Sequence, residues 1–124
     1  MSKTFRRISA AALAGLMATC MAVSASAATN TYKCSCGKTT TSTLEVSSTR
    51  AVATTSIDDG TRGVSVSIYG EYWEKGTGVL KNIGGGDSKP VGVTASILNN
   101  GGTWKSVKST HSQCCSMSNK VLNW

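Results

Sequence analysis

The sequence predicts an all-β protein, a small antiparallel β-sandwich of six or seven strands, with a partly open β-barrel as the alternative. Three observations predict this fold. The segment from Val64 to Trp73 alternates apolar and polar residues, as a strand does when one face lies on a core and the other in water. Turn-forming Gly, Asn and Asp residues separate further runs of β-branched residues. No stretch after the N-terminal segment has the periodicity of an amphipathic helix.

The N-terminus predicts export from the cell. Lys3, Arg6 and Arg7 precede an apolar run over residues 8–23, and Ala25-Ser26-Ala27 has the small-residue form that signal peptidase cleaves. We therefore expect a signal peptide over residues 1–27, cleaved near Ala27, and a secreted mature chain.

The mature chain, residues 28–124, is long enough for one domain with a modest core. We expect it to begin with an extended N-terminal arm over residues 28–40. Of the 13 basic residues, three lie in the signal peptide, so 13 − 3 = 10 face six acidic ones and the net charge is about +4. The basic residues are scattered, which favours weak attraction to anionic surfaces over nucleic-acid binding. No further segment is apolar enough to cross a membrane.

Two turn signals predict β-hairpins. The first, Asp59-Gly60, is expected to pair the strands on either side of it, with Ala53 opposite Val66. The same register puts Arg50 opposite Tyr69 on the other face.

The second turn signal, Asn99-Asn100-Gly101-Gly102, is expected to pair a strand over residues 91–98 with one over residues 103–113, placing Ile97 opposite Trp104. Between the two hairpins, Gly84-Gly85-Gly86 begins a segment that ends at Pro90, and its composition predicts a flexible loop.

Cysteine usage predicts two disulfides, because an even number of cysteines in a small exported chain is typical of a disulfide framework. The mature cysteines are Cys34, Cys36, Cys114 and Cys115. A bond within either close pair would be strained, so both bonds should run between the pairs, in either of the two possible connectivities. The alternative is a metal site made of these four thiolates. Neither pair has the two-to-four-residue gap that structural zinc prefers, so we expect no metal.

Catalytic residues are not expected. His111 is the only histidine, and although Ser109 and Ser112 are close in sequence, no nucleophile elbow or orienting acid accompanies them. The sequence favours a surface or hydrogen-bonded strand histidine. We therefore expect a protein that is not an enzyme and needs no cofactor, with a small hydrolase using His111 as the least favoured alternative.

Aromatic residues offer a candidate binding site. Tyr69 and Trp73 share the polar face of the central strand with Glu71 between them, and Arg50 is expected opposite. Exposed aromatic planes beside charged groups suit sugar rings or a protein partner. The alternative is that a second sheet or the N-terminal arm covers these rings.

In general format, an exported chain with a short all-β mature domain and an aromatic C-terminus, the sequence resembles the lactococcin-type β-sandwich bacteriocins. The resemblance implies an antibacterial role. The residues themselves favour a secreted bacterial binding domain that acts at the cell surface or envelope, through a glycan, an anionic polymer or a surface protein. A cationic antibacterial protein is the alternative.

The disulfide prediction can be tested on mature protein purified after export. It should contain no titratable thiol, and its mass should lie about 4 Da below that of the reduced chain, since each disulfide removes two hydrogens. Reduction should lower the melting temperature sharply, because the disulfides restrict the unfolded chain. Four titratable thiols together with bound zinc or copper would show a metal site instead.

Overall fold

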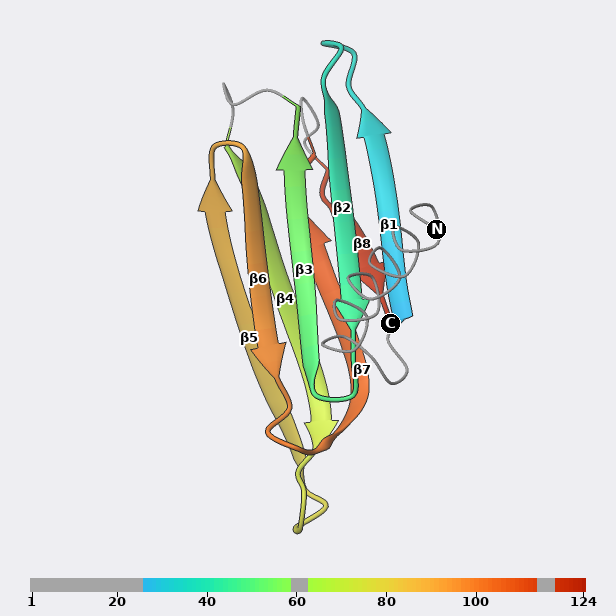
Figure 1. Cartoon of the computed structure of the whole chain (residues 1–124), viewed down its shortest axis with the longest axis vertical. Helices are drawn as coiled ribbons and strands as arrows, with labels where there is room; N and C mark the ends of the chain where they lie inside the picture. The colour runs from blue at the N-terminus through green and yellow to red at the C-terminus, as the bar shows by residue number, and fades with distance from the viewer. Residues whose placement is uncertain (1–25, 59–62, 114–117) are drawn as a thin grey trace, which may run out of the picture.

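The computed structural model describes residues 26–58, 63–113 and 118–124, and these form eight strands in two four-stranded sheets (Figure 1). This arrangement confirms the predicted antiparallel β-sandwich, with eight strands where the sequence predicts six or seven, because part of the expected N-terminal arm forms a strand. The strands are β1 (Ser26–Lys33), β2 (Thr39–Val46), β3 (Arg50–Ile57), β4 (Val64–Trp73), β5 (Leu80–Lys89), β6 (Gly92–Leu98), β7 (Thr103–His111) and β8 (Lys120–Asn123).

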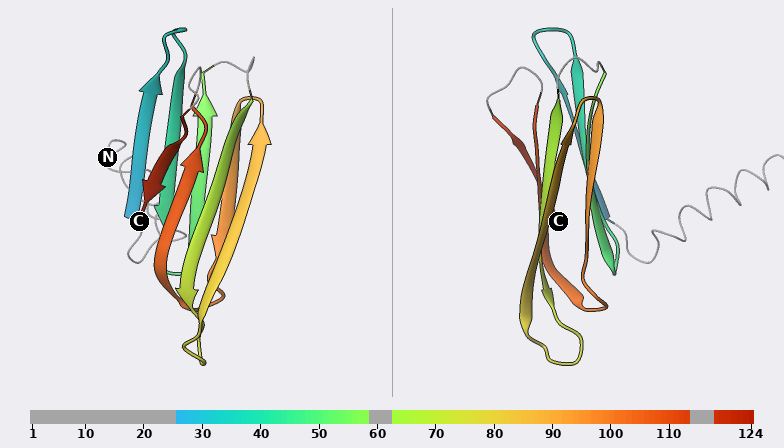
Figure 2. Two further views of the ribbon diagram at one scale, coloured as in Figure 1. Left: turned by 180° about the vertical axis from the view of Figure 1, so that it is seen from behind. Right: turned by 90° about the vertical axis from the view of Figure 1, so that its left-hand side faces the viewer.

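The two sheets have the strand orders β1-β2-β3-β6 and β5-β4-β7-β8, here called sheet I and sheet II. Every pairing within them is antiparallel. The right-hand view of Figure 2 shows the sheets edge-on, as two layers side by side. The chain passes between the layers three times, from β3 to β4, from β5 to β6 and from β6 to β7. Within the described ranges, no helix is long and apolar enough to span a membrane.

The core lies between the inner faces of the two sheets. In β4 buried and more accessible residues alternate along the whole strand, as its sequence predicts. The other inner strands supply matching apolar side chains, and small residues of β3 face larger ones. The buried apolar residues of these strands include Leu44, Val46, Ala51, Ala53, Val66, Ile68, Val93, Ile97, Trp104 and Val107.

The first predicted hairpin is wrong, because β3 and β4 belong to different sheets. In the structure Ala53 lies opposite Leu44 on one side and Ala95 on the other, and Arg50 lies opposite Leu98. Alternation identifies the buried face of each strand, but two strands can share a core either side by side or across it. The turn at residues 59–62 lies outside the described residues.

The second predicted hairpin is also wrong, since β6 pairs in sheet I and β7 in sheet II. The turn itself has the expected backbone, with φ of 53° at Asn100 and 82° at Gly101. Buried Asn99 fixes the turn by donating from Nδ2 to the Ser48 carbonyl oxygen at 2.7 Å. The turn therefore carries the chain from one sheet to the other.

The glycine-rich segment is not a loop but the greater part of β5. Gly84 lies opposite Tyr69 and Gly86 opposite Ser67, so the segment continues the ladder with β4. Glycine weakens a strand through its conformational freedom, which is why composition alone favours a loop. Pairing along ten residues of β4 supplies the hydrogen bonds that outweigh this cost.

The first part of the expected N-terminal arm, residues 28–33, belongs to strand β1, which pairs with β2 along its length, from Ser26 opposite Val46 to Lys33 opposite Thr39. The predicted signal peptide lies outside the described residues apart from Ser26 and Ala27.

One close approach shapes sheet II. At Gly70 of β4, an added Cβ atom would lie 2.7 Å from both the Cδ1 atom of Ile97 and the ring of Trp104. Immediately beside it the β4–β7 ladder contains a bulge, with Glu71 opposite Ser106 but Tyr72 opposite Trp104. A bulge places an extra residue in one strand and changes which side chains face outward.

Candidate functional site

Two exposed aromatic rings lie on the outer face of sheet II. Tyr69 is 37% exposed and Trp73 is 44% exposed, both on the side of β4 that faces away from the core. They are four residues apart on one strand, a separation of roughly 13 Å at the usual rise per residue. Neither ring is covered by sheet I or by β1, so the alternative of buried rings does not hold.

A lysine lies over each of these rings. The Nζ atom of Lys105 is 5.8 Å from the ring centroid of Trp73, and that of Lys108 is 5.5 Å from the ring centroid of Tyr69. Both distances are within the range of cation–π attraction. Lys108 is opposite Tyr69 in the ladder, whereas Lys105 is the extra residue of the bulge. The bulge therefore lets β7 supply a lysine to each ring.

Glu71 lies between the two rings and is held by β7. Its Oε2 atom is 3.9 Å from the Nζ atom of Lys105, and its Oε1 atom accepts a hydrogen bond from the Ser106 hydroxyl at 3.4 Å. Among the described carboxylates none forms an ion pair with Lys108. The ammonium group of Lys108 is thus available to an anion in solution.

We call this group the aromatic face, and it consists of Tyr69, Glu71, Trp73, Lys105 and Lys108. On the β5 side it is bordered by bare backbone, since Gly84 lies opposite Tyr69. A Cβ atom at Gly84 would lie 4.0 Å from the Tyr69 ring, so the glycine leaves that edge of the ring open. Arg50, expected here from the first hairpin, is on sheet I instead.

The outer face of sheet I has a different chemistry. Its outward positions form rows of short hydroxyl side chains, and Thr54 and Thr94 approach within 3.2 Å through their Oγ1 atoms. The outward residues with hydroxyl groups are Thr29, Thr31, Thr39, Thr41, Thr43, Thr54, Ser56, Thr94 and Ser96. The exposed aromatic residue Tyr32 of the edge strand β1 lies opposite buried Thr40 and so does not belong to this outer face. Only sheet II therefore combines exposed rings with cations on one outer face.

His111 is a fully buried, hydrogen-bonded strand histidine, in agreement with the sequence analysis. Its Nδ1 atom is 2.7 Å from Thr55 Oγ1, and its Nε2 atom is 2.6 Å from Ser109 Oγ. Burial lowers the pKa of His111 from 6.5 to about 4, while a backbone hydrogen bond with Thr54 acts in the opposite direction. Ser109 is also buried, so no substrate can reach this Ser–His pair in the folded sandwich.

The cysteine prediction falls mainly outside the described residues, because Cys114 and Cys115 lie there. Cys34 is buried and disulfide-bonded. The connectivity between the two pairs stays a prediction. In the described ranges no cluster of three or more His, Cys, Asp or Glu side chains could hold a metal ion.

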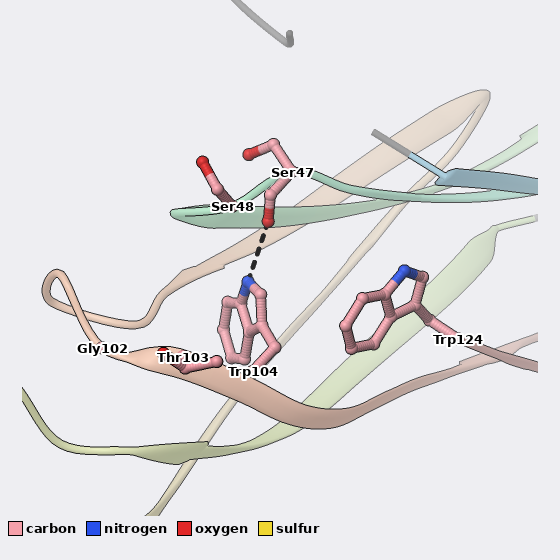
Figure 3. A pocket seen from close by; sticks show the side chains of 6 residues that line it. All are labelled: Ser47, Ser48, Gly102, Thr103, Trp104 and Trp124. Atoms are coloured by element: carbon pink, nitrogen blue, oxygen red, sulfur yellow. Dashed lines mark hydrogen bonds between the residues drawn. The ribbon is translucent and has the colours of Figure 1, made fainter. Parts of the chain in front are cut away.

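Sequence reasoning missed a cavity of about 290 Å³ at one end of the sandwich (Figure 3). Its lining residues are Ser47, Ser48, Gly102, Thr103, Trp104 and Trp124. They come from three segments far apart in the chain, so no local spacing could have indicated the cavity. The only available signal was that two of the three tryptophans are in the C-terminal part of the chain.

Comparisons of the chain with protein-family models, with curated proteins and with solved structures find no match. The chemistry of the aromatic face and of the cavity is therefore the basis from which a function is inferred. Both present indole or phenol rings to solvent beside groups that form hydrogen bonds or ion pairs, an arrangement that suits binding of a ligand with apolar faces and polar edges.

The buried histidine predicts a specific pH dependence of stability. Folding lowers the pKa of His111. As the pH falls, the unfolded chain therefore takes up a proton on this imidazole near pH 6.5, whereas the folded chain takes it up only near pH 4. This contribution to stability is complete above pH 6.5 and is lost as the pH falls towards 4, a change of about 3 kcal/mol in the free energy of unfolding.

Urea unfolding of the protein and of a His111→Gln variant between pH 7.5 and 4 measures this difference. The variant should lack the loss that the histidine causes, while the carboxylates affect both proteins alike. NMR titration of the single imidazole gives the folded pKa directly. A value near 6.5 in the folded protein would refute the assigned burial.

Proposed function

We propose that this protein is a secreted, non-catalytic binding protein of the bacterial cell envelope, and that its aromatic face binds an anionic glycan polymer. The observation that carries the proposal is the pair of exposed rings on one strand, Tyr69 and Trp73, each with a lysine ammonium group within 6 Å of its centroid.

The aromatic face offers the two kinds of contact that an anionic glycan can make, ring stacking and ion pairing. Aromatic planes stack on the C–H faces of sugar rings, and the ammonium groups beside them pair with phosphate or carboxylate groups on the same ligand. Lys108, which has no carboxylate partner among the described residues, is the primary cation for this purpose. Binding of neutral sugars alone would not require the ammonium group of Lys108.

The spacing of the rings favours an extended ligand over a single sugar. Two rings roughly 13 Å apart along a strand can contact successive units of a chain that runs parallel to β4. The strand is an inner strand of sheet II, paired on both sides, so the rings are held on a rigid element. The expected net charge of about +4 in the mature chain adds long-range attraction to an anionic envelope.

A non-catalytic role is supported by the position of the single histidine. His111 and Ser109 are buried between the sheets and hydrogen-bonded to each other, and they lie away from the outer surface on which Tyr69 and Trp73 are exposed. Binding at the aromatic face would therefore proceed without any contribution from these two side chains.

A double substitution tests the proposal. Tyr69→Ala with Trp73→Ala should weaken binding to isolated Gram-positive cell walls at least tenfold, about 1.4 kcal/mol, because both stacking surfaces are lost. The matched control is Tyr32→Ala, which removes a ring of similar exposure, 36% against 37%, from sheet I and should bind normally. Melting temperatures of all variants verify that the fold is retained.

The same assay identifies the ligand and the alternative role. Walls stripped of teichoic acid should retain little of the protein, and binding should weaken as the salt concentration rises. Equal binding by the double variant and the unaltered protein would contradict the proposal. Inhibition of bacterial growth by the unaltered protein, lost in the double variant, would assign the antibacterial role to this same surface.

A further inference from the structure

The cavity at the end of the sandwich is formed where three segments meet. The turn between β2 and β3 contributes Ser47 and Ser48, the start of β7 contributes Thr103 and Trp104, and Trp124 follows β8. Figure 3 shows the two indole rings next to each other with the serines on one side and Thr103 on the other. At about 290 Å³ the cavity is at the lower limit for small-molecule sites and is large enough for one sugar ring.

One wall of the cavity is fixed in place. Trp104 is only 7% exposed, and its Nε1 atom donates a hydrogen bond to the Ser47 carbonyl oxygen at 3.0 Å. Its ring meets the Tyr72 ring edge-on, with 5.9 Å between centroids and an interplanar angle of 83°. Only a small part of this fixed ring therefore borders the cavity, and the ring with surface free for stacking is that of Trp124.

The second aromatic wall is anchored only through its backbone. The backbone N–H of Trp124 donates to the Val107 carbonyl oxygen at 2.9 Å, while the side chain is 45% exposed. The indole ring can therefore adjust to a ligand that enters beside Trp104.

The side chains of the lining are uncharged. The polar ones are the hydroxyls of Ser47, Ser48 and Thr103, and none of the described lining residues carries a charged side chain. An anionic ligand would lose hydration here without gaining a counter-charge from any lining side chain. The Ser47 hydroxyl already donates to the Arg50 carbonyl oxygen at 3.0 Å and accepts from the Arg50 backbone N–H at 3.1 Å, so the Ser48 and Thr103 hydroxyls are the groups of the lining that a polar ligand edge would engage. A ring with C–H faces and hydroxyl edges satisfies both the indoles and the hydroxyls.

We propose that this cavity is a subsite for a single neutral pyranose unit. The sugar stacks on the exposed ring of Trp124 beside the fixed ring of Trp104, and its hydroxyl groups exchange hydrogen bonds with the Ser48 and Thr103 hydroxyls. We call it the pyranose subsite.

The pyranose subsite borders the aromatic face. Thr103 lines the cavity and is also the residue opposite Trp73 in the β4–β7 ladder. If the proposed function holds, a glycan that runs along β4 past Trp73 reaches the subsite with its next neutral unit. The subsite itself does not need this connection, because a free monosaccharide can enter it alone.

NMR titration of the full mature protein with methyl glycosides of glucose and of N-acetylglucosamine tests the subsite. The indole N–H signals of Trp104 and Trp124 should shift with at least one of these sugars, and the Trp73 signal should move less. Trp124→Ala should weaken this binding at least tenfold. Thr103→Val, which keeps the shape of the side chain and removes the hydroxyl, should weaken it several-fold. The control variant Trp73→Ala should bind the monosaccharide normally.

The outcomes separate this inference from the proposed function. If neither sugar shifts the two signals, or if Trp124→Ala binds as the unaltered protein does, the pyranose subsite is refuted even when cell walls are still bound through the aromatic face. If the monosaccharide titrates as expected while Tyr69→Ala with Trp73→Ala binds walls normally, the subsite stands and the function proposed for the aromatic face fails.

Discussion

The close packing of Trp104 and Ile97 on Gly70 is the constraint on which both candidate binding regions depend. A glycine at this position leaves the space that the large indole occupies in a core whose other residues are mostly small or β-branched. With Trp104 turned inward opposite Tyr72, the bulge that follows places Lys105 on the outer face, next to Glu71 and Trp73. A packing requirement inside the sandwich thus determines which cation borders an exposed ring outside it.

The same indole connects the two sheets at one end of the sandwich. Trp104 belongs to sheet II and donates its hydrogen bond to Ser47, at the end of a sheet I strand, while Asn99 fixes the neighbouring connection to Ser48. Near the other end of β7, His111 makes an equivalent link to Thr55 of sheet I. Buried polar groups with satisfied hydrogen bonds favour one arrangement of the two layers over others of equal apolar content. The pyranose subsite and the aromatic face therefore lie on a scaffold whose sheets cannot slide freely.

Features that depend on local sequence pattern, such as the bounds of β4 and the turn conformation at Asn100 and Gly101, could be predicted. Features that depend on residues distant in the chain, such as strand pairing, could not. Alternation gave the bounds and buried face of β4, and with them the shared outer position of Tyr69 and Trp73. Asn100 and Gly101 adopt the positive φ values that their turn signal implies, yet the same turn chemistry serves a hairpin or a passage between layers, so strand pairing could not follow from it. The glycines of β5 looked like a loop because their strand character comes from pairing with β4. The lining of the pyranose subsite comes from segments that only the folded chain brings together.

The measurement that tests this account most directly is the stability and structure of Gly70→Ala compared with Gly85→Ala. An added methyl group at Gly70 has no room unless Trp104 moves, so the first variant should lose about 1–3 kcal/mol of unfolding free energy, with altered near-ultraviolet circular dichroism and a shifted Trp104 indole signal. A methyl group at Gly85 meets only ordinary contacts of 3.8 Å or more, so the second variant should stay within about 1 kcal/mol of the unaltered protein. Equal stability of the two variants, with an unchanged Trp104 signal, would contradict the dependence of both sites on this packing.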